Sequence, residues 1–345
     1  MKKKLTYSDA GVDVKAANLT KQKIKELAHS TYNGSVLTEL GSFGGLYDLS
    51  AIGIDNPVLV SSVDGVGTKL KLAFMTGNHK GVGRDIVCHC INDILVQGAK
   101  PLFFMDYIAM GRHDSNVIQQ IIASLASACR DNNCALLGGE MAEMPDFYKD
   151  GEYDLAGMIV GVVDKSSIID GSTIAPGDIV MGMGSSGLHT NGYSLARKAL
   201  LEIKGFSLSD QPEILDGITV AQALLEPHKS YLDPVMETLK FHKIKGLAHI
   251  TGGGFEDNIV RVLPHNCRVV IDPDKWKVPP IFTLIEEAGE ISKNEMFRTF
   301  NMGIGMVAFV DPGFAADVLK IMRGFPLNVF EIGFVEKSLK GVKIL

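Results

Sequence analysis

The segment from residue 61 to residue 69 carries residue types that could bind a nucleotide. Its sequence, SSVDGVGTK, begins like a strand and ends in a loop with two glycines, a hydroxyl and an ammonium group. Backbone N–H groups freed by glycine suit phosphates, as does a lysine, and the aspartate could hold a divalent cation. The segment lacks the spacing of a P-loop, and a tight turn with an incidental lysine is the alternative. The candidate residues are Asp64, Gly65, Gly67, Thr68 and Lys69.

Acidic residues in two further segments are placed near this loop by the predicted elements. Asn92 and Asp93 occur in a helix whose other face is apolar, and either is costly to bury without a partner. Glu140 follows two glycines and a strand predicted at 134–137. Three carboxylates around one small sheet, those of Asp64, Asp93 and Glu140, predict a Mg²⁺ site for a nucleotide. A solvated polar helix face is the alternative for Asn92 and Asp93.

A second glycine-rich loop spans residues 182–191. Its G-x-G-x-x-G spacing between a strand and a helix matches the dinucleotide fingerprint, but no acidic residue ends a following strand about 20 residues later. The polar residues of the loop instead favour a phosphate monoester at the start of a helix. A structural turn is the alternative. The candidate residues are Ser185, Ser186, Gly187, His189, Thr190 and Asn191.

The remaining glycine clusters and histidines give weaker signals. Loops at 41–45, which include Gly44 and Gly45, and at 251–254 could fold over phosphates. His89 lies between two cysteines in a predicted helix, where neighbouring side chains point about 100° apart, so Cys88 and Cys90 are interpreted as packing residues. The other histidines lack the spacing of a metalloprotease or a catalytic triad and are interpreted as surface or core residues. They are His29, His79, His113, His228, His242, His249 and His265.

Strands and helices alternate along the chain. The first half predicts strands at 57–63, 101–110, 134–137 and 155–163, with helices at 84–98 and after Asp114 or Ser115. A turn-rich interval at 169–178 predicts a boundary between domains 1–170 and 171–345. The second half predicts strands at 179–183, 247–251, 267–271, 302–310 and 327–335, and helices after Asn191 and at 227–240, 256–262 and 313–323. The expected fold class is α/β (α+β) with two domains.

Composition and charge exclude several classes of protein. Of the 345 residues, 46% are hydrophobic and 21% are charged, which is typical of a globular protein. A net charge of -6 argues against a nucleic-acid or anionic-membrane partner. No apolar run approaches the roughly 18 residues of a membrane span, and the five cysteines contain no CxxC pair. We expect a soluble, cytoplasmic chain with reduced thiols.

Eight segments, taken in order, resemble the phosphoribosylformylglycinamidine cyclo-ligases, also called aminoimidazole ribonucleotide synthetases. The segments are YSDAGVD (7–13), DGVGTK (64–69), NDILVQGA (92–99), PLFF (101–104), GGEMAEMP (138–145), SSGLHTNGYS (185–194), TGGG (251–254) and RTFNMGIGM (298–306). The resemblance covers nearly the whole chain. Met141, Thr190 and Met302 stand where the family pattern has Thr, Ser and Cys.

The resemblance implies an ATP-dependent ring closure in purine biosynthesis, with Mg²⁺ as cofactor. It implies a homodimer whose N-terminal domains form a shared β-barrel, and a C-terminal α/β sandwich that contributes the ribonucleotide phosphate loop. ATP would contact the 64–69 loop together with Gly44 and Gly45. Asp93, His189 and Asn92 are the candidates for catalysis, and the choice between Asp93 and His189 as proton acceptor stays open.

Other ATP-dependent enzymes of the same architecture are the nearest alternatives. They are selenide water dikinase, thiamine-monophosphate kinase and the synthetase one step earlier in the pathway. The first would carry a cysteine or selenocysteine near its N-terminus, which this chain lacks, and the last is usually much longer. A nucleotide-sensing scaffold without turnover is the non-enzymatic alternative.

Overall fold

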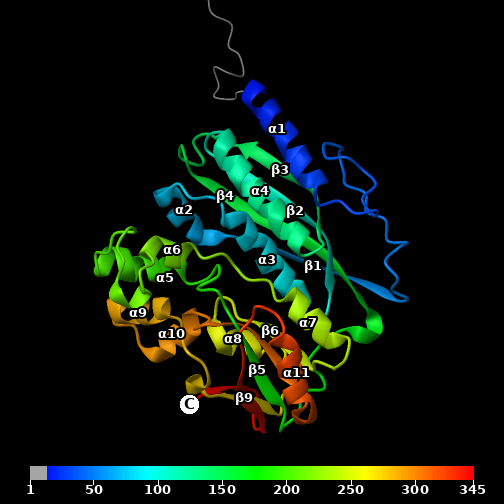
Figure 1. Ribbon diagram of the computed structural model, residues 1–345, viewed down its shortest axis with the longest axis vertical. Helices are drawn as coiled ribbons and strands as arrows, with labels where there is room; N and C mark the ends of the chain where they lie inside the picture. Colours follow the sequence, from blue (N-terminus) through cyan, green and yellow to red (C-terminus); the bar gives the residue numbers. More distant parts are fainter. Residues whose placement is uncertain (1–13) are drawn as a thin grey trace, which may run out of the picture.

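The chain folds into two halves, each built on one β-sheet (Figure 1). The structure is a computed structural model and describes residues 14–345, so the motif at 7–13 lies outside the described residues. Among the helices of the described chain, none combines the length and the hydropathy needed to cross a membrane.

Four strands form the sheet of the first half. Their order is β1 (Pro57–Gly65), β4 (Tyr153–Asp164), β2 (Lys100–Met110) and β3 (Ala135–Glu143). β4 runs antiparallel to β1 and β2, whereas β2 and β3 are parallel. The sheet is therefore mixed, as predicted. Because β1, β2 and β3 all run in the same direction, their carboxyl ends lie at the same end of the sheet.

Helices cover one face of this sheet. α3 (Val82–Leu95) and α4 (Ser115–Asp131) lie side by side over it, and α1 (Val14–His29) packs against α4 and β3 (Figure 1). Asp114 begins α4 as an N-cap, because its carboxylate accepts hydrogen bonds from two backbone N–H groups. Gly83 allows α3 to approach α4, since a Cβ there would lie 2.5 Å from the backbone oxygen of Ile121.

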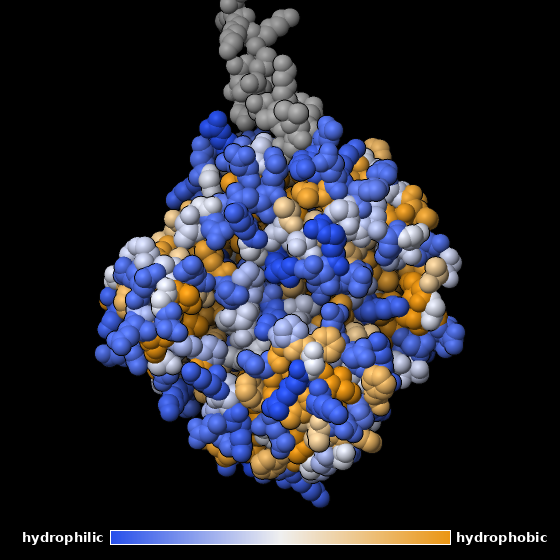
Figure 2. Space-filling view, in the orientation of Figure 1, coloured by the Kyte–Doolittle hydropathy of each residue, from blue (hydrophilic) through white to orange (hydrophobic). Residues whose placement is uncertain are grey.

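The other face of this sheet carries exposed apolar side chains. Val63, Met158 and Met105 are neighbours across β1, β4 and β2, and their exposed fractions are 71%, 42% and 36%. Hydrophobic residues also show at the right-hand margin of the space-filling view (Figure 2). Within residues 14–345, no helix packs on this face of β1, β4 and β2.

Six strands form the sheet of the second half. Their order is β10 (Gly341–Ile344), β7 (Cys267–Ile271), β9 (Val329–Lys337), β5 (Ile179–Gly184), β8 (Ile304–Val310) and β6 (Gly246–His249). β8 is buried on both faces: Met306, Ala308 and Val310 join one core cluster, and Val307 and Phe309 join the other. A strand that is buried on both faces has an uninterrupted apolar sequence, and this run is why its position could be predicted.

Helices lie on both faces of the second sheet. On one face are α7 (Leu232–Leu239) and α11 (Ala315–Met322). On the other are α5 (Tyr193–Arg197), which continues as a π-helical segment (Lys198–Ile203), and α8 (Gly254–Ile259), α9 (Pro280–Gly289) and α10 (Lys293–Thr299). α2 (Leu70–Thr76) and α6 (Val220–Leu225) pack against each other where the halves meet. The sandwich and barrel descriptions and the boundary at residue 170 remain predictions.

Two predicted elements have different limits. The strand predicted at 134–137 continues to Glu143, because Gly139 lets the strand run past Asp106: a Cβ there would lie 2.4 Å from the carboxylate. The helix predicted at 227–240 begins only at Leu232. Residues before it are held in an irregular loop by α3, since the backbone N–H groups of His228 and Tyr231 donate to side chains of that helix. Five helices and one strand were not predicted: α1, α2, α6, α9, α10 and β10.

A buried ion pair joins the two halves. The Lys69 ammonium lies 2.8 Å from an Asp85 carboxylate oxygen, and both side chains are 0% exposed. Lys69 also donates to the carbonyl oxygens of His189 and Glu226, at 3.2 and 2.8 Å. The same Asp85 oxygen accepts the backbone N–H of His228. The first half thus supplies the charges and the second half supplies backbone groups that surround them.

Lys69→Met should lower the free energy of unfolding by about 3–5 kcal/mol, because it leaves the Asp85 charge buried and unpaired. Lys71→Met is the matched control, since Lys71 pairs with Glu152 in a contact that is 45% and 30% exposed and should lose less than about 1 kcal/mol. Urea unfolding of both variants measures the difference. Equal losses would contradict the structural role given to Lys69.

Candidate functional site

Two carboxylates and an imidazole meet at the end of β1. His89 Nε2 lies 2.8 Å from Asp64 Oδ2 and 3.6 Å from Asp93 Oδ2. The three side chains offer ligand atoms that all lie within 4.8 Å of one another, and Asp64 is 46% exposed. The corner made by Asp64, His89 and Asp93 therefore brings together two of the three predicted metal ligands and remains open to solvent.

The spacing of α3 explains how this corner forms. His89 and Asp93 are one helical turn apart and lie on the same face, and Asp85 lies one turn earlier. α3 is buried on nearly every side, and Asp93 is one of its few partly exposed residues. Ser62, from β1, donates to Asp93 Oδ2 at 3.0 Å and fixes the carboxylate against the sheet.

Both aspartates are held in their ionised form. The hydrogen bond from His89 is the main cause that lowers the pKa of Asp64 below its ordinary value. Burial alone would raise the pKa of Asp93, but the hydrogen bond and charge of His249 and the charge of His89 bring it below its ordinary value. Ionised oxygens are good ligands for a divalent cation and weak proton acceptors.

The second half contributes two more histidines to the same place. His249 ends β6, and its Nδ1 lies 2.8 Å from Asp93 Oδ1. His228, in the loop before α7, lies with its Nε2 3.2 Å from His249 Nε2. Burial lowers the pKa of both imidazoles and so favours their neutral forms. Neither was singled out from the sequence.

The prediction that Asn92 takes part in catalysis needs a correction. Its side chain forms hydrogen bonds that hold the loop before α7 against α3. Its amide nitrogen donates to the Lys229 carbonyl at 2.8 Å and faces His228 Nε2 at 3.2 Å, and its amide oxygen accepts the Tyr231 N–H. The side chain is 0% exposed. The sequence signal, a polar residue costly to bury, was correct, but its partners are structural and not a substrate.

The loop at 185–191 lies between the corner and β8, and most of its hydroxyls have partners inside the protein. Ser185 donates to the Gly187 carbonyl or to Asn301, and Ser186 donates to the Pro227 carbonyl at 2.6 Å. The Thr190 hydroxyl contacts His89 Nδ1 at 2.8 Å. Asn191 is partly exposed and reaches Thr190 only at 3.4 Å. The loop is therefore pre-shaped, and its role with a phosphate remains a prediction.

His189 is buried at the base of this loop. Its ring stacks on that of His228 at 3.9 Å between centroids, and its backbone has a positive φ of 62°. Burial, followed by the charge of His249, lowers the pKa of His189 well below its ordinary value. Its Nδ1 has no hydrogen-bond partner in the described chain. The role of His189 as a proton acceptor remains a prediction.

The sequence predicted that the Lys69 ammonium would contact a phosphate, but the structure buries it in other contacts. All three donors of its ammonium are taken by Asp85 and two carbonyls, so none is left for a phosphate in this conformation. Gly67 and Thr68 are exposed beside it, with the Thr68 hydroxyl 3.1 Å from that of Ser194. The residues of this loop that can meet a ligand are thus Asp64, Gly65, Gly67 and Thr68.

Glu140 and the Gly44–Gly45 loop lie away from Asp64 within one chain, which corrects the predicted three-carboxylate cluster. Glu140 is in register with Tyr107, and Asp64 is in register, through β4, with Asp106. Alternate residues point to opposite faces, so Glu140 and Asp64 lie on different faces of the sheet. β3 is also three strand spacings from β1, or roughly 14 Å. Gly45 packs on Leu137 of β3.

The histidines missed from the sequence are distant from one another along the chain. His89 could have been found from its one-turn spacing to Asp93 on α3. His228 and His249 carry no local signal, because their meeting depends on the packing of the two halves. Single histidines without a motif are indistinguishable from core residues until the fold is known.

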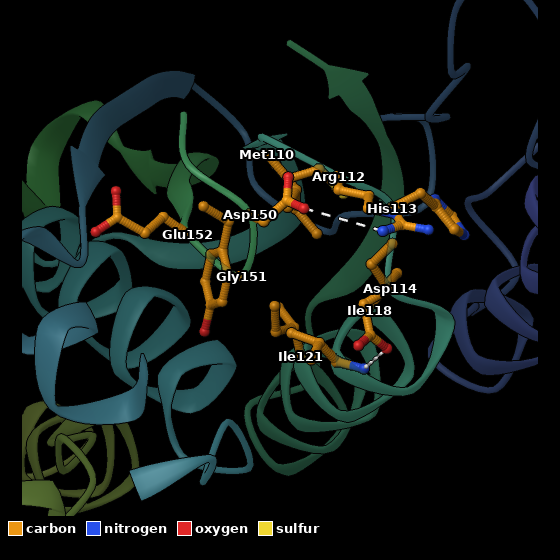
Figure 3. Close-up of a pocket in the computed structure, with 12 residues that line it drawn as sticks. Met110, Arg112, His113, Asp114, Ile118, Ile121, Asp150, Gly151 and Glu152 are labelled. Atoms are coloured by element: carbon orange, nitrogen blue, oxygen red, sulfur yellow. Dashed lines mark hydrogen bonds and ion pairs between the residues drawn. The ribbon is translucent and has the colours of Figure 1, made fainter. Parts of the chain in front are cut away.

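The described chain also contains cavities outside the corner of Asp64, His89 and Asp93. One, of about 370 Å³, is lined by residues at the ends of β2 and β4 and the start of α4, including Met110, Arg112, Asp114 and Asp150 (Figure 3). It contains none of the predicted site residues. Another, of about 390 Å³, lies between the halves and includes Ser186 and Lys229 in its wall.

Comparison with known proteins gives matches over both halves. Residues 47–163 match the AIR synthase related protein, N-terminal domain, and residues 175–344 match the AIR synthase related protein, C-terminal domain. The chain is 51% identical to a phosphoribosylformylglycinamidine cyclo-ligase of Trichlorobacter lovleyi, over 98% of this chain and 97% of that protein. It is 50% identical to one of Syntrophotalea carbinolica, over 97% and 96%.

Solved structures share the fold at low sequence identity. Thiamine-monophosphate kinase from Stenotrophomonas maltophilia superposes with a TM-score of 0.66 at 14% identity, covering 92% of this chain and 94% of that one. HypE of E. coli, a hydrogenase maturation protein, superposes with a TM-score of 0.66 at 18% identity, covering 94% of this chain and 93% of that one. T. maritima PurL complexed with AMPPCP superposes with a TM-score of 0.55 at 14% identity, covering 96% of this chain and 48% of that one. The family matches and the full-length relatives confirm the resemblance found in the sequence: the chain belongs to the AIR synthase related family.

Proposed function

We propose that the chain closes the imidazole ring of aminoimidazole ribonucleotide from formylglycinamidine ribonucleotide, consuming ATP and releasing ADP and phosphate. The observation that carries this proposal is the 51% identity, over 98% of the chain, to a protein named for that reaction. Solved structures that share the fold include a hydrogenase maturation protein HypE in complex with ATP and PurL complexed with AMPPCP, which is consistent with nucleotide use.

The chemistry requires activation of a poor electrophile. A formamide carbonyl becomes reactive when ATP phosphorylates its oxygen, and the amidine nitrogen of the same molecule then attacks that carbon and expels phosphate. Holding the nitrogen near the carbon contributes up to roughly 7–11 kcal/mol to such an intramolecular step. The loop from Asp64 to Thr68 approaches the start of α5, which follows the loop at 185–191, through Thr68 and Ser194, so both substrates can meet between the halves.

The ionised pair Asp64 and Asp93 fits a magnesium ion. Both carboxylates are partly open to solvent, and each has a histidine nitrogen within 2.8 Å, His89 Nε2 at Asp64 and His249 Nδ1 at Asp93. Mg²⁺ bound there would neutralise charge on the transferring phosphoryl group. The role assigned to Asp93 is therefore a cation ligand and electrostatic group, since its lowered pKa makes it a weak base.

A homodimer through the first sheet is part of the proposal. The exposed apolar face over Val63, Met158 and Met105 has a polarity suited to a second sheet, as in the dimeric barrel that the family resemblance implies. The mixed sheet of the first half would then form one side of that barrel, and the second half would remain outside it.

Asp93→Asn should lower kcat by roughly 10²-fold or more, because it removes a charge that holds the cation and stabilises the transition state. The variant keeps one acceptor for His249 and should lose only about 1–3 kcal/mol of stability. Asp317→Asn, on the exposed side of α11, is the control. Phosphate release with both substrates and Mg²⁺, beside a thermal melt, measures the effect. A folded Asp93→Asn enzyme within about threefold of wild type would remove Asp93 from the mechanism.

Met158→Glu should convert the dimer to monomers, since it places a charge at the centre of the apolar face. Phe241→Glu, at an exposed position of the second half, should leave the dimer intact. Sedimentation velocity reports whether the wild-type mass is twice the chain mass of 37.2 kDa. A monomeric wild type at micromolar concentration, or a dimer that survives Met158→Glu, would contradict this interface.

A further inference from the structure

Three buried histidines face one another where the halves join. His89 comes from α3, His228 from the loop before α7, and His249 from the end of β6. Their ring centroids are 5.4, 5.1 and 5.2 Å apart, and each ring offers a nitrogen within 4.8 Å of the others. Their exposed fractions are 4%, 1% and 6%.

The hydrogen bonds around two of these rings turn their lone pairs toward each other. His249 Nδ1 must donate to the ionised Asp93, so His249 Nε2 carries a lone pair. Asn92 has its orientation fixed by Tyr231 N–H and the Lys229 carbonyl, and its remaining N–H points at His228 Nε2. His228 Nε2 is then also an acceptor, and it lies 3.2 Å from His249 Nε2. Either a proton or a metal cation between the two nitrogens would remove the repulsion between their lone pairs.

The separations match those of a tetrahedral metal site. Metal–nitrogen bonds of about 2.0–2.1 Å at tetrahedral angles place ligand nitrogens about 3.4 Å apart and imidazole centroids about 5 Å apart. The 3.2 Å between the two Nε2 atoms and the nearly equal centroid separations of 5.1–5.4 Å agree with both values.

The second nitrogen of each ring also has a nearby oxygen atom, of the kind that hydrogen-bonds to metal-bound histidines and orients them. Asp93 holds His249 Nδ1, and the Thr190 hydroxyl lies 3.5 Å from His228 Nδ1. His89 is held by Thr190 at Nδ1 and by Asp64 at Nε2, so one nitrogen stays fixed when the other binds. Carboxylate and hydroxyl partners of this type orient the imidazole and raise its basicity.

We propose that His89, His228 and His249 bind a first-row transition dication such as Zn²⁺, in a site that adjoins the carboxylates that suit Mg²⁺ and shares His89 with them. Three imidazoles favour Zn²⁺, Co²⁺ or Cu²⁺ over Mg²⁺, which prefers oxygen ligands. The ion ties α3 of the first half to the loop and strand of the second half. This inference goes beyond ring closure and does not depend on it.

Zn²⁺ binding to the full-length, chelator-treated protein tests the site. We expect one ion per chain by calorimetry, with an affinity unchanged by millimolar Mg²⁺, and a rise of roughly 5 °C or more in Tm at saturating Zn²⁺. His228→Gln and His249→Gln should each weaken binding at least about 10-fold to 100-fold. His242→Gln, whose wild-type ring packs against Phe314 in a tilted arrangement away from the cluster, should bind like wild type.

X-ray absorption at the zinc edge of the wild-type complex needs no variant. The expected first shell contains three imidazole nitrogens at about 2.0–2.1 Å. A shell of oxygens only, or an affinity that His228→Gln leaves unchanged, would overturn the proposal and move the ion to the carboxylates. Ring closure measured in Mg²⁺ with a zinc chelator is a separate assay, so a failed zinc site and a failed ring closure are distinguishable.

Discussion

The buried pair of Lys69 and Asp85 sets the relation between the two halves. An ammonium and a carboxylate that are both out of water need a close contact and further hydrogen bonds to offset their lost hydration. Here the remaining donors of Lys69 and a lone pair of Asp85 are satisfied by backbone groups of the second half, at His189, Glu226 and His228. Moving the halves apart would strand two charges, so the loops that carry these backbone groups are held close to α3.

What the second half contributes to the candidate site depends on that placement. The loop at 185–191 and the loop carrying His228 are both hydrogen-bonded to the ion pair, and His249 is brought against Asp93, two turns after Asp85 on α3. α3 therefore presents Asp85, His89 and Asp93 in succession, one residue for joining the halves and two for ligands. A single helix face combines the structural and the chemical roles because its residues recur one turn apart.

Features that depend on neighbouring residues in the sequence could be predicted, whereas contacts between distant parts of the chain could not. Strand β8 and the helix face of α3 are local patterns, and both were predicted near their observed limits. Asp64 and Asp93 were placed together correctly because β1 and α3 adjoin. Lys69 was assigned to phosphate because its Asp85 partner lies in a different element, and nothing local indicates that pairing.

Other misplacements have similar causes. Glu140 was grouped with Asp64 without the strand order, which puts the two residues on opposite edge strands and opposite faces. α9 has a clear apolar face, with Ile281, Phe282 and Ile285 buried, and was missed although its pattern is local. The His228–His249 contact joins a loop to a strand end and could not be inferred before the fold.

A crystal structure with a non-hydrolysable ATP analogue, Mg²⁺ and the ribonucleotide substrate tests the site most directly. The predicted result is a magnesium ion bound by Asp64 and Asp93, with the γ-phosphate between that corner and the loop at 185–191. Lys69 should remain paired with Asp85. A nucleotide in the cavity beside Arg112 and Asp150, with no ion at Asp64 and Asp93, would contradict the placement of the reaction between the two halves.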